Sequence, residues 1–520
     1  MNLHLMLVRR TALALALLLT AIFSVAAQDK DQCSLVKVTL LQVNDVYQFA
    51  PVDQGTKGGL GRVLTLKKAI QQENPNTLLL MSGDTISPSV ESITYKGAQM
   101  IEAWNAIGLD YATYGNHEFD FGPDVLKQRI SESKFGWIAA NVIDKQSNKP
   151  FGDAKRYVVR EFGGVKVGIF GLVLPDTKIT SKPGDNVEFR SPCDTAKEIV
   201  SELHAQGVKV VVALTHLSMR EDKEVARCAG VNLIVGGHEH SLLESHAGKA
   251  PIFKMTSDAR ELGRIDLNIN STTGELDSID WKVIPVDSTT QEAPEFAAIY
   301  KKYATLLAEL AKPIGSTSVA LDARSKENRT RETNVGNFIA DAFRKALMAD
   351  VGFTNGGSVR ADTIISPGKL TQRDLLSMLP FKNKLVKIEV TGATLRAALE
   401  HGVSRSTGDS EPGEFPQVSG IQYSFDASRP PGSRIVEVKV NGLPLDDAKK
   451  YTMATTTFTG LEGGDGYAMF KGSKVIIAPD QAPTDADAVR KAIGTRPIAP
   501  KVEGRIKRLD AGQKSGTNCN

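Results

Sequence analysis

The first half of the chain repeats one unit, and this repeat constrains the fold most. In each unit a short apolar run rich in β-branched residues alternates with an amphipathic stretch of helical spacing. The apolar runs are residues 36–43, 77–81, 165–173, 208–214 and 231–235, and the helical stretches include 60–72, 98–107, 194–205 and 219–228. Strands that alternate with helices in this way predict an α/β domain.

Polar side chains of metal-ligand type stand at the ends of four of these runs and after residues 111–115. They are Asp45, Asp84, Asn116 with His117, His216, and His238 with His240. We expect the strands to belong to one sheet, because the carboxyl ends of strands are where α/β sheets place their sites. One such residue alone would be a turn aspartate or a buried histidine, but their coincidence indicates a metal centre.

The ligand types narrow the chemistry of that centre. Oxygen and imidazole ligands without a thiolate suit Zn²⁺, Mn²⁺ or iron, and the number of ligands implies two ions. Two ions about 4 Å apart can share Asp84, hold a bridging hydroxide and polarise a phosphoryl oxygen for in-line attack.

The second half reads as a separate unit. Residues 294–311 carry apolar side chains at helical spacing and end in Lys312-Pro313, which predicts a connecting helix. Beyond it, helices are expected at 334–348 and 392–401, and strands at 385–390 and 435–440. This pattern predicts a second α/β domain.

Residues 1–27 have the pattern of a cleaved export signal. Arg9 and Arg10 precede the apolar run 11–25, which ends in Val25-Ala26-Ala27, small residues that a signal peptidase accepts. The alternative is an uncleaved anchor, but a membrane-spanning helix needs about 20 apolar residues and this run is shorter. We therefore expect a periplasmic or secreted protein without a membrane anchor.

Composition and charge argue for a soluble globular protein and against one that binds nucleic-acid polymers. The chain has 41% hydrophobic and 24% charged residues, which is ordinary for a soluble globular protein. Loss of residues 1–27 removes two arginines and no acidic residue, and so lowers the formal net charge from +3 to +1. Because basic runs with interleaved aromatic residues are absent from the sequence, we expect no nucleic-acid polymer as a partner.

The four cysteines are Cys33, Cys193, Cys228 and Cys519, and none is spaced like a zinc cluster. Export to an oxidising compartment favours disulfides, and we predict a structural bridge between Cys193 and Cys228. Pairing of Cys33 with Cys519 would require the two ends of the mature chain to meet, so both pairing and free thiols stay open.

Longer motifs resemble known families. The motifs that resemble calcineurin-like metallophosphoesterases are Gly83-Asp84, Gly115-Asn116-His117-Glu118, Thr215-His216 and Gly237-His238-Glu239-His240. The motifs that resemble the substrate domain of the 5′-nucleotidase family are Arg331-Glu332-Thr333-Asn334-Val335-Gly336-Asn337, Asn355-Gly356-Gly357-Ser358-Val359-Arg360, Leu379-Pro380-Phe381 and Gly463-Gly464-Asp465-Gly466-Tyr467. The resemblance implies a four-layer α/β metallophosphoesterase sandwich joined by a linker helix to a second α/β substrate-recognition domain. The implied boundaries are 1–27 for the signal peptide, 28–290 and 314–510 for the domains, 291–313 for the linker and 511–520 for a flexible tail.

The same resemblance implies roles for the residues of the first domain. Asp45, Asp84 and His240 would hold one metal, and Asp84, Asn116, His216 and His238 the other. His117, paired with Asp120, would be the catalytic dyad that stabilises charge on the transferred phosphoryl group. Asp120 can orient the imidazole and favour its cationic form.

In the second domain the resemblance implies a nucleotide site. Arg331 and Arg360 match the anion-binding arginines, and Arg329 lies close enough to share or replace that role. The nucleobase would lie between Phe381 and Phe458. Asn355 and Asp465 would bind base and ribose, and glycines such as Gly357 would let the backbone approach the ligand.

Two departures from the family pattern stand out. The first motif usually reads Asp-x-His, with the histidine as a metal ligand, but here it reads Asp45-Val46-Tyr47. Tyr47 either binds Fe³⁺, as a tyrosine does in purple acid phosphatases, or packs beside a metal short of one ligand, or accompanies a weaker ion. We favour the second interpretation, with water in the open position, because a phenol with a pKa near 10 is a poor ligand at neutral pH. The segment between Phe458 and Asp465 is also one residue longer than the family pattern.

The resemblance implies an enzyme that removes phosphate from nucleoside 5′-phosphates, with two divalent ions from among Zn²⁺, Mn²⁺, Co²⁺ and Mg²⁺, or iron. Alternatives within this class are a UDP-sugar or dinucleotide pyrophosphatase, and a 2′,3′-cyclic-nucleotide phosphodiesterase with 3′-nucleotidase activity. A different alternative is a nucleotide-binding protein whose metal site has decayed at Tyr47. The expected partner is a small nucleotide, and a monomer is favoured.

Overall fold

The computed structural model describes residues 34–407 and 410–510. The expected signal peptide, Cys33, Cys519 and the expected tail lie outside these residues. Within them, no helix combines the length and the apolar character needed to cross a membrane.

The N-terminal domain is built on two large mixed sheets, and a small third sheet is formed by β5 (Val142–Asp144), β6 (Lys149–Pro150) and β9 (Val187–Phe189). The first large sheet has the order β15-β14-β1-β2-β3-β4, in which β1 to β4 are parallel and β14 runs antiparallel to both of its neighbours, β1 and β15. Its strands are β1 (Leu35–Val43), β2 (Thr77–Met81), β3 (Tyr111–Ala112), β4 (Gly136–Trp137), β14 (Glu261–Asn270) and β15 (Leu276–Pro285).

The second sheet has the order β12-β13-β11-β10-β8-β7, with a parallel centre and an antiparallel strand at each edge. Its strands are β7 (Tyr157–Phe162), β8 (Val165–Val173), β10 (Val210–His216), β11 (Leu233–Gly236), β12 (Leu243–Ala247) and β13 (Ala250–Lys254). The expectation of one sheet is therefore wrong. Every run is apolar on both faces of its strand, and this pattern does not reveal which sheet a strand joins.

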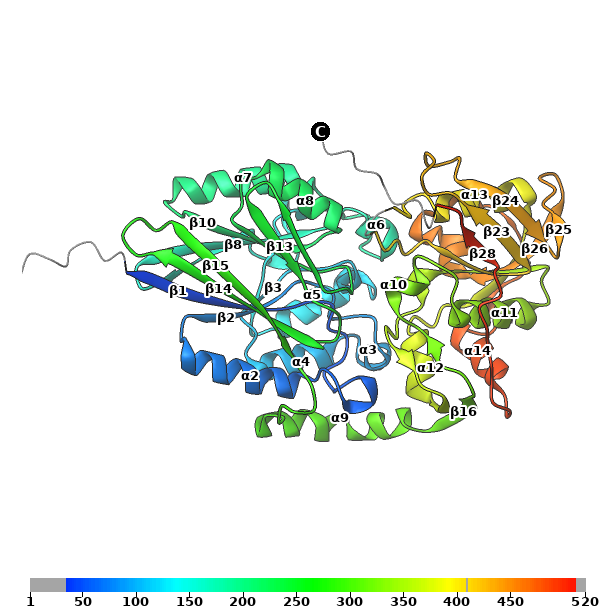
Figure 1. Cartoon of the computed structure of the whole chain (residues 1–520), viewed down its shortest axis with the longest axis horizontal. Helices are drawn as coiled ribbons and strands as arrows, with labels where there is room; N and C mark the ends of the chain where they lie inside the picture. Colours follow the sequence, from blue (N-terminus) through cyan, green and yellow to red (C-terminus); the bar gives the residue numbers. More distant parts are fainter. Residues whose placement is uncertain (1–33, 408–409, 511–520) are drawn as a thin grey trace, which may run out of the picture.

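The two sheets pack face to face and are covered by helices. Residues such as Leu40, Leu78, Val212 and Val235 form one buried apolar cluster between the sheets. The outer faces are covered by α2 (Leu60–Glu73) and α4 (Ala98–Ile107) on one side, and by α7 (Pro192–Ala205) and α8 (Met219–Cys228) on the other (Figure 1). The predicted four-layer arrangement is confirmed, and it explains why strands such as β10 are buried along their whole length.

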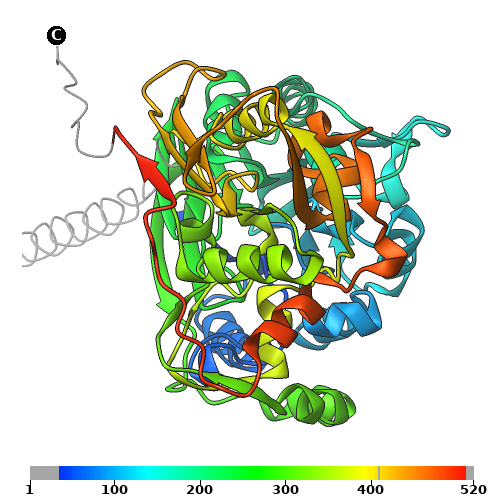
Figure 2. The same cartoon turned by 90° about the vertical axis from the view of Figure 1, so that its right-hand side faces the viewer.

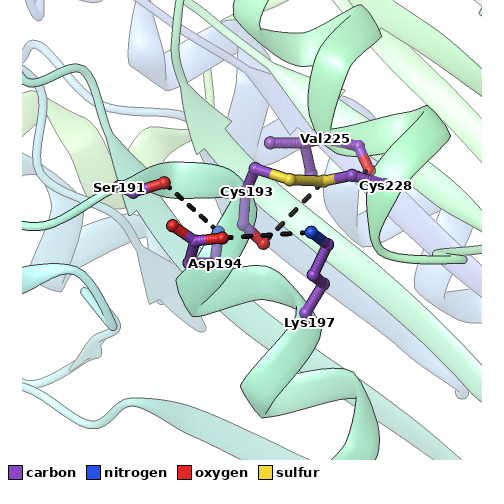
Figure 3. The surroundings of a disulfide bond; sticks show 6 residues. All are labelled: Ser191, Cys193, Asp194, Lys197, Val225 and Cys228. Atoms are coloured by element: carbon purple, nitrogen blue, oxygen red, sulfur yellow. Dashed lines mark hydrogen bonds and ion pairs between the residues drawn. A yellow bond between two sulfur atoms is a disulfide. The ribbon is translucent and has the colours of Figure 1, made fainter.

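The predicted disulfide is present and joins the two helices of one outer layer. Cys193 lies in the first turn of α7 and Cys228 is the last residue of α8, with their Cα atoms 6.2 Å apart (Figure 3). The Ser191 hydroxyl accepts a hydrogen bond from the backbone amide of Asp194 and so caps α7 beside the bridge.

A connecting helix, α9 (Ala297–Leu310), runs from the N-terminal to the C-terminal domain (Figure 1). It follows a short turn at Pro294–Phe296, so the segment is helical over nearly the predicted range. Phe296, Ile299 and Tyr303 are buried against the N-terminal domain, and Tyr303 packs on Phe49.

The C-terminal domain is built on a sheet of order β22-β18-β26-β21-β27, beside a smaller sheet of order β25-β24-β23-β28. One face of the larger sheet carries α11 (Asn334–Leu347), α12 (Gln372–Met378) and α14 (Asp485–Ile493), and the other carries α13 (Gly392–Gly402) (Figure 2). The strands are β18 (Val351–Asn355), β21 (Leu385–Thr391), β22 (Pro416–Ser419), β23 (Ile421–Phe425), β24 (Ile435–Val440), β25 (Leu443–Pro444), β26 (Lys450–Thr456), β27 (Lys474–Ile477) and β28 (Ile506–Arg508). The predicted helices and strands of this half agree with these bounds to within one residue.

Candidate metal centre and substrate cavity

The strand ends of both sheets meet at one place in the N-terminal domain. Asp45 and Asp84 follow β1 and β2 of the first sheet, whereas His216 ends β10 of the second. Ligand atoms of these three residues lie within 4.8 Å of one another, and all three side chains are buried. Asp45 and Asp84 have positive φ values of 52° and 60°, a region that L-residues other than glycine rarely occupy.

Hydrogen bonds hold the two carboxylates in place. Asp45 Oδ2 accepts from Asn44 Nδ2 at 2.8 Å and from the backbone amide of His238 at 2.9 Å. Asp84 Oδ1 accepts from the backbone amide of His117 at 2.8 Å. Each carboxylate thereby links its own strand end to the loop that carries another predicted site residue.

A buried glutamate that we did not predict orders the same loops. The carboxylate of Glu118 accepts hydrogen bonds from the backbone amides of Asp84, Thr85 and Ile86 at 2.9, 2.6 and 3.2 Å, and also from that of Gly115. Burial, and then the charge of Asp84, raises the pKa of Glu118 to about 7. The only signal in the sequence that Glu118 belongs to the site is its place directly after His117 in the motif.

The donor set fits divalent cations. His216 Nδ1 lies 2.8 Å from the carbonyl oxygen of Ser82 and donates to it, which leaves Nε2 facing Asp84 Oδ2 at 3.1 Å. His216 Nε2 and Asn116 Oδ1 are buried without a hydrogen-bond partner in the described residues. An imidazole nitrogen and an amide oxygen without partners, next to two buried carboxylates, are the ligands such ions take.

The electrostatics of the cluster also favour positive charge. Burial lowers the pKa of His216, but the Asp84 and Asp45 carboxylates outweigh burial and raise it to about 10. His238 stays neutral because burial, and then the neighbouring His216, hold its pKa well below the usual value. A bound cation would replace the proton that these carboxylates attract to His216.

His240 is held from both domains. Its Nε2 lies 3.3 Å from Asp45 Oδ1, and its Nδ1 lies 3.4 Å from Asp362 Oδ2 of the C-terminal domain. Asp362 also accepts a hydrogen bond from the Ser257 hydroxyl at 2.7 Å. No sequence pattern indicated Asp362, because only the folded arrangement brings it to His240.

Tyr47 lies inside the cluster. Its hydroxyl is 3.1 Å from Asp45 Oδ1 and 3.0 Å from His240 Nε2, and it accepts a hydrogen bond from Arg360 Nη2 at 2.7 Å. Burial keeps the pKa of Tyr47 well above 10, so the side chain is a neutral phenol. The hydroxyl thus connects the metal-ligand cluster to an arginine of the C-terminal domain.

A cavity of about 240 Å³ opens over this cluster between the two domains. Its wall includes most of the predicted residues, namely Asp84, Asn116, His117, Asp120, His238, His240, Asn355, Gly357, Arg360, Phe381, Phe458 and Asp465. Asp45 and His216 lie buried beneath the wall.

The predicted dyad faces the cavity. His117 Nδ1 lies 2.8 Å from Asp120 Oδ2, and the Ser181 hydroxyl donates to Asp120 Oδ1 at 2.7 Å. The His117 ring stacks on Phe381 with centroids 5.9 Å apart. Asp120 is therefore fixed on both oxygens and can orient the imidazole toward the cavity.

Of the two predicted arginines, Arg331 and Arg360, only Arg360 lines the cavity. Arg360 is buried and lines the cavity, but the side chain of Arg331 is 62% exposed, pairs with Glu327 and does not reach the cavity. Arg329 lies there instead and is only 6% exposed. Both residues follow α10 (Ser325–Asn328), and the chain leaves this helix with the two side chains on different sides.

Arg329 and Arg360 make a cationic surface in the cavity. The Nε atoms of both are buried without a hydrogen-bond partner in the described part of the chain. Burial, and then the charge of Arg360, lowers the pKa of Arg329. Two buried guanidinium groups with unused donors suit a phosphate or another anion.

The remaining wall belongs to the C-terminal domain. Asn355 Nδ2 donates to Asp465 Oδ2 at 2.5 Å, and Asp465 has a positive φ of 52°. Residues Phe458–Glu462 form a π-helical turn, which takes up one residue more than an α-helical turn. Phe458, at the start of this turn, and Asp465, beyond its end, line the same cavity.

Comparison with known proteins agrees with this geometry. Residues 38–242 match the calcineurin-like phosphoesterase family, and residues 313–472 match the 5′-nucleotidase C-terminal domain. The 5′-nucleotidase of Diplobatis ommata is 31% identical, over 90% of this chain and 89% of its own length. The trifunctional nucleotide phosphoesterase protein YfkN of Bacillus subtilis is also 31% identical over 94% of this chain, which spans 36% of that longer protein.

A solved structure supports the same conclusion. The crystal structure of a 5′-nucleotidase precursor from Thermus thermophilus matches with a TM-score of 0.83 and 29% identity, covering 91% of this chain and 100% of the other. The chain belongs to the 5′-nucleotidase family, whose members are phosphoric monoester hydrolases.

Proposed function

We propose that this protein is an exported, metal-dependent 5′-nucleotidase that removes phosphate from nucleoside 5′-phosphates. The observation that carries the proposal is a single cavity with three kinds of surface. Unpartnered metal-type ligands such as Asn116 form its floor, two buried arginines with free donors lie beside them, and Phe381 and Phe458 line the same cavity. This combination suits a phosphate attached to a flat, apolar base.

We assign one metal to Asp45, Asp84 and His240, and the other to Asp84, Asn116, His216 and His238. Two divalent ions would act as Lewis acids toward a phosphoryl oxygen and would generate the nucleophile from water. Tyr47 is proposed to remain a neutral phenol beside the first ion. Its hydroxyl is already engaged with Arg360 and Asp45, which supports a site with one ligand fewer than usual.

The other residues bind and orient the substrate. Arg329 and Arg360 would bind the phosphate, and His117, fixed by Asp120, would donate a hydrogen bond to it as its charge grows. Phe381 and Phe458 would hold the base, and Asn355 and Asp465 the polar edges of base and ribose. Gly357 lines the same cavity and, having no side chain, would let the backbone approach the ligand.

Export is supported by two independent features. Residues 1–27 have the pattern of a cleaved signal, and Cys193 is bonded to Cys228, as is usual in oxidising compartments. We therefore propose a periplasmic or secreted location.

Phosphate release by the mature protein tests the function. The protein is stripped with a chelator, resupplied with Zn²⁺, Mn²⁺, Co²⁺, Mg²⁺ or iron, and offered 5′-AMP, 3′-AMP, ATP, UDP-glucose and 2′,3′-cyclic AMP. We expect metal-restored release from 5′-AMP, and none from the Asp84→Asn variant.

The other outcomes separate the alternatives. Preference for UDP-glucose would indicate a pyrophosphatase, and preference for the cyclic substrate with 3′-AMP a phosphodiesterase. Nucleotide binding without release under any ion would contradict the proposal and indicate a binding protein.

A further inference from the structure

Lys254, the last residue of β13, is fully buried, yet it takes no part in the cavity wall. Its Nζ lies 2.7 Å from Asp222 Oδ2 and is also paired with a carboxylate oxygen of Glu239. Lysine is almost never buried completely unless its charge is paired, and here it is paired twice. Its position therefore needs an explanation in terms of what the ammonium holds.

The ammonium group joins two loops through their backbone. It donates to the carbonyl oxygen of Leu217 at 2.7 Å and to that of Gly237 at 2.9 Å. Leu217 follows His216, and Gly237 precedes His238. One cation thereby fixes the chain just beyond β10 and β11, beside three of the proposed metal ligands, His216, His238 and His240.

The two carboxylates extend the same network. Asp222 Oδ1 accepts a hydrogen bond from the Thr215 hydroxyl at 2.6 Å, and Glu239 Oε1 accepts one from the backbone amide of Met219 at 2.6 Å. Glu239 stands between His238 and His240 in the sequence, so its side chain fixes the loop from within.

The neighbouring strand leaves room for this side chain. Gly236 of β11 lies opposite Lys254 of β13 in the sheet. A Cβ at Gly236 would lie 3.0 Å from Lys254 Cε and 3.2 Å from Asp222 Oδ2. A larger residue would press on the lysine stem, so the glycine is part of the arrangement.

We infer that Lys254 is a positioning residue that sets the geometry of His216, His238 and His240 for metal binding. Stability alone does not explain it, because buried ion pairs are often replaced by apolar residues at little cost to stability. Replacing a residue that holds metal ligands in place without binding the metal itself typically lowers metal affinity 10- to 100-fold. The inference rests on the proposed two-metal function.

The test compares two buried lysines. Lys254→Met removes the donors at nearly constant length. Lys67→Met is the matched control, because Lys67 is also buried and donates to backbone carbonyls, those of Ile107 and Gly108, in a helical layer away from the cavity. Metal affinity is measured by titrating each stripped protein with Mn²⁺ and Zn²⁺ against a chromophoric chelator. The visible spectrum of the Co²⁺-loaded protein reports the ligand geometry.

We expect Lys254→Met to bind metal 10- to 100-fold more weakly and to change the Co²⁺ spectrum. Lys67→Met should keep the wild-type affinity and spectrum even where it lowers the melting temperature. If Lys254→Met does not fold, the double variant Lys254→Met/Asp222→Asn, which removes one charge of each sign, is titrated with the same expectation.

Wild-type affinity and an unchanged spectrum in the folded Lys254 variant would overturn the inference while leaving the proposed function intact. Equal losses in Lys254→Met and Lys67→Met would also overturn it, since they would indicate a general effect of instability. A wild-type protein that binds no ion would overturn the proposed function and this inference with it.

Discussion

At the scale of single residues, the anion-binding surface of the cavity depends on which of two neighbouring arginines, Arg329 or Arg331, points into the cavity. Arg331 matches the anion-binding arginine of the family pattern, and Arg329, two positions earlier, lies close enough in the sequence to share or replace that role. Only Arg329 is buried in the cavity, whereas Arg331 forms an exposed pair with Glu327. Exposed pairs contribute little, because water screens them, but a buried guanidinium with free donors binds anions strongly.

This difference predicts the kinetics of two neighbouring variants. Arg329→Ala should raise the KM for 5′-AMP about 10- to 100-fold, because a hydrogen bond to a charged group contributes roughly 1.5–3 kcal/mol. Arg331→Ala should stay within about twofold of wild type. Steady-state kinetics on both proteins, with their melting temperatures as a control for folding, decide the matter. A larger effect at Arg331 would contradict the assignment.

At the scale of elements, buried ionisable side chains bind the backbone at the ends of several strands and of one helix. Glu118 accepts hydrogen bonds from backbone amides just after β2 and β3, and Lys254 donates hydrogen bonds to backbone carbonyls just after β10 and β11. Helix α14 begins with another buried ionisable group, the carboxyl group of Asp485, which accepts a hydrogen bond from the backbone amide of Ala486 at 2.7 Å. Burial raises the pKa of Asp485 from 3.8 to about 7 despite this bond.

The raised pKa of Asp485 predicts a pH-dependent stability. Because the folded protein holds the proton more tightly than the unfolded chain, this group stabilises the fold fully below about pH 4, and its contribution is lost as pH rises to about 7. Asp485→Asn, which cannot ionise, should therefore gain free energy of unfolding relative to wild type between pH 5 and 8, on the order of 2–4 kcal/mol.

Denaturant unfolding at several pH values measures this difference. The exposed Asp480→Asn, in the turn before α14, serves as the control and should follow the wild-type pH dependence. Parallel pH profiles for wild type and Asp485→Asn would contradict the prediction.

At the scale of the whole molecule, the two domains complete one site. The C-terminal domain reaches the metal-ligand cluster through Arg360, which contacts Tyr47, and through Asp362, which contacts His240. Ion pairing of Arg405 with Asp176, and a hydrogen bond from Ser241 to Glu411, join the domains at the rim of the cavity. The cavity is therefore a property of the paired domains.

Metal removal should lower the stability of the N-terminal domain. Buried Asp45 and Asp84 face each other, and a ligand that binds only the folded state stabilises it by about 2.7 kcal/mol at a hundred times its Kd. Chelator should therefore lower the melting temperature, and resupplied Mn²⁺ or Zn²⁺ should restore it. Asp84→Asn serves as the control and should respond far less. An identical response of the two proteins would show that the ions act elsewhere.

The amino-acid sequence sufficed to predict the α/β class, the order of strands and helices, the candidate ligands after the strands and the Cys193–Cys228 bridge. The class, the order of elements and the candidate ligands follow from local periodicity and from motifs, which short-range sterics and burial dictate. The bridge was predicted from the expected oxidising compartment. Tertiary structure alone decided that the ligands come from two sheets, and that Arg329 rather than Arg331 enters the cavity. The fold also brings Asp362 to His240, and Lys254 to the backbone beside His216 and His238. These features depend on contacts between residues far apart in the chain. The periodicity of an apolar run does not indicate which strand will lie beside it.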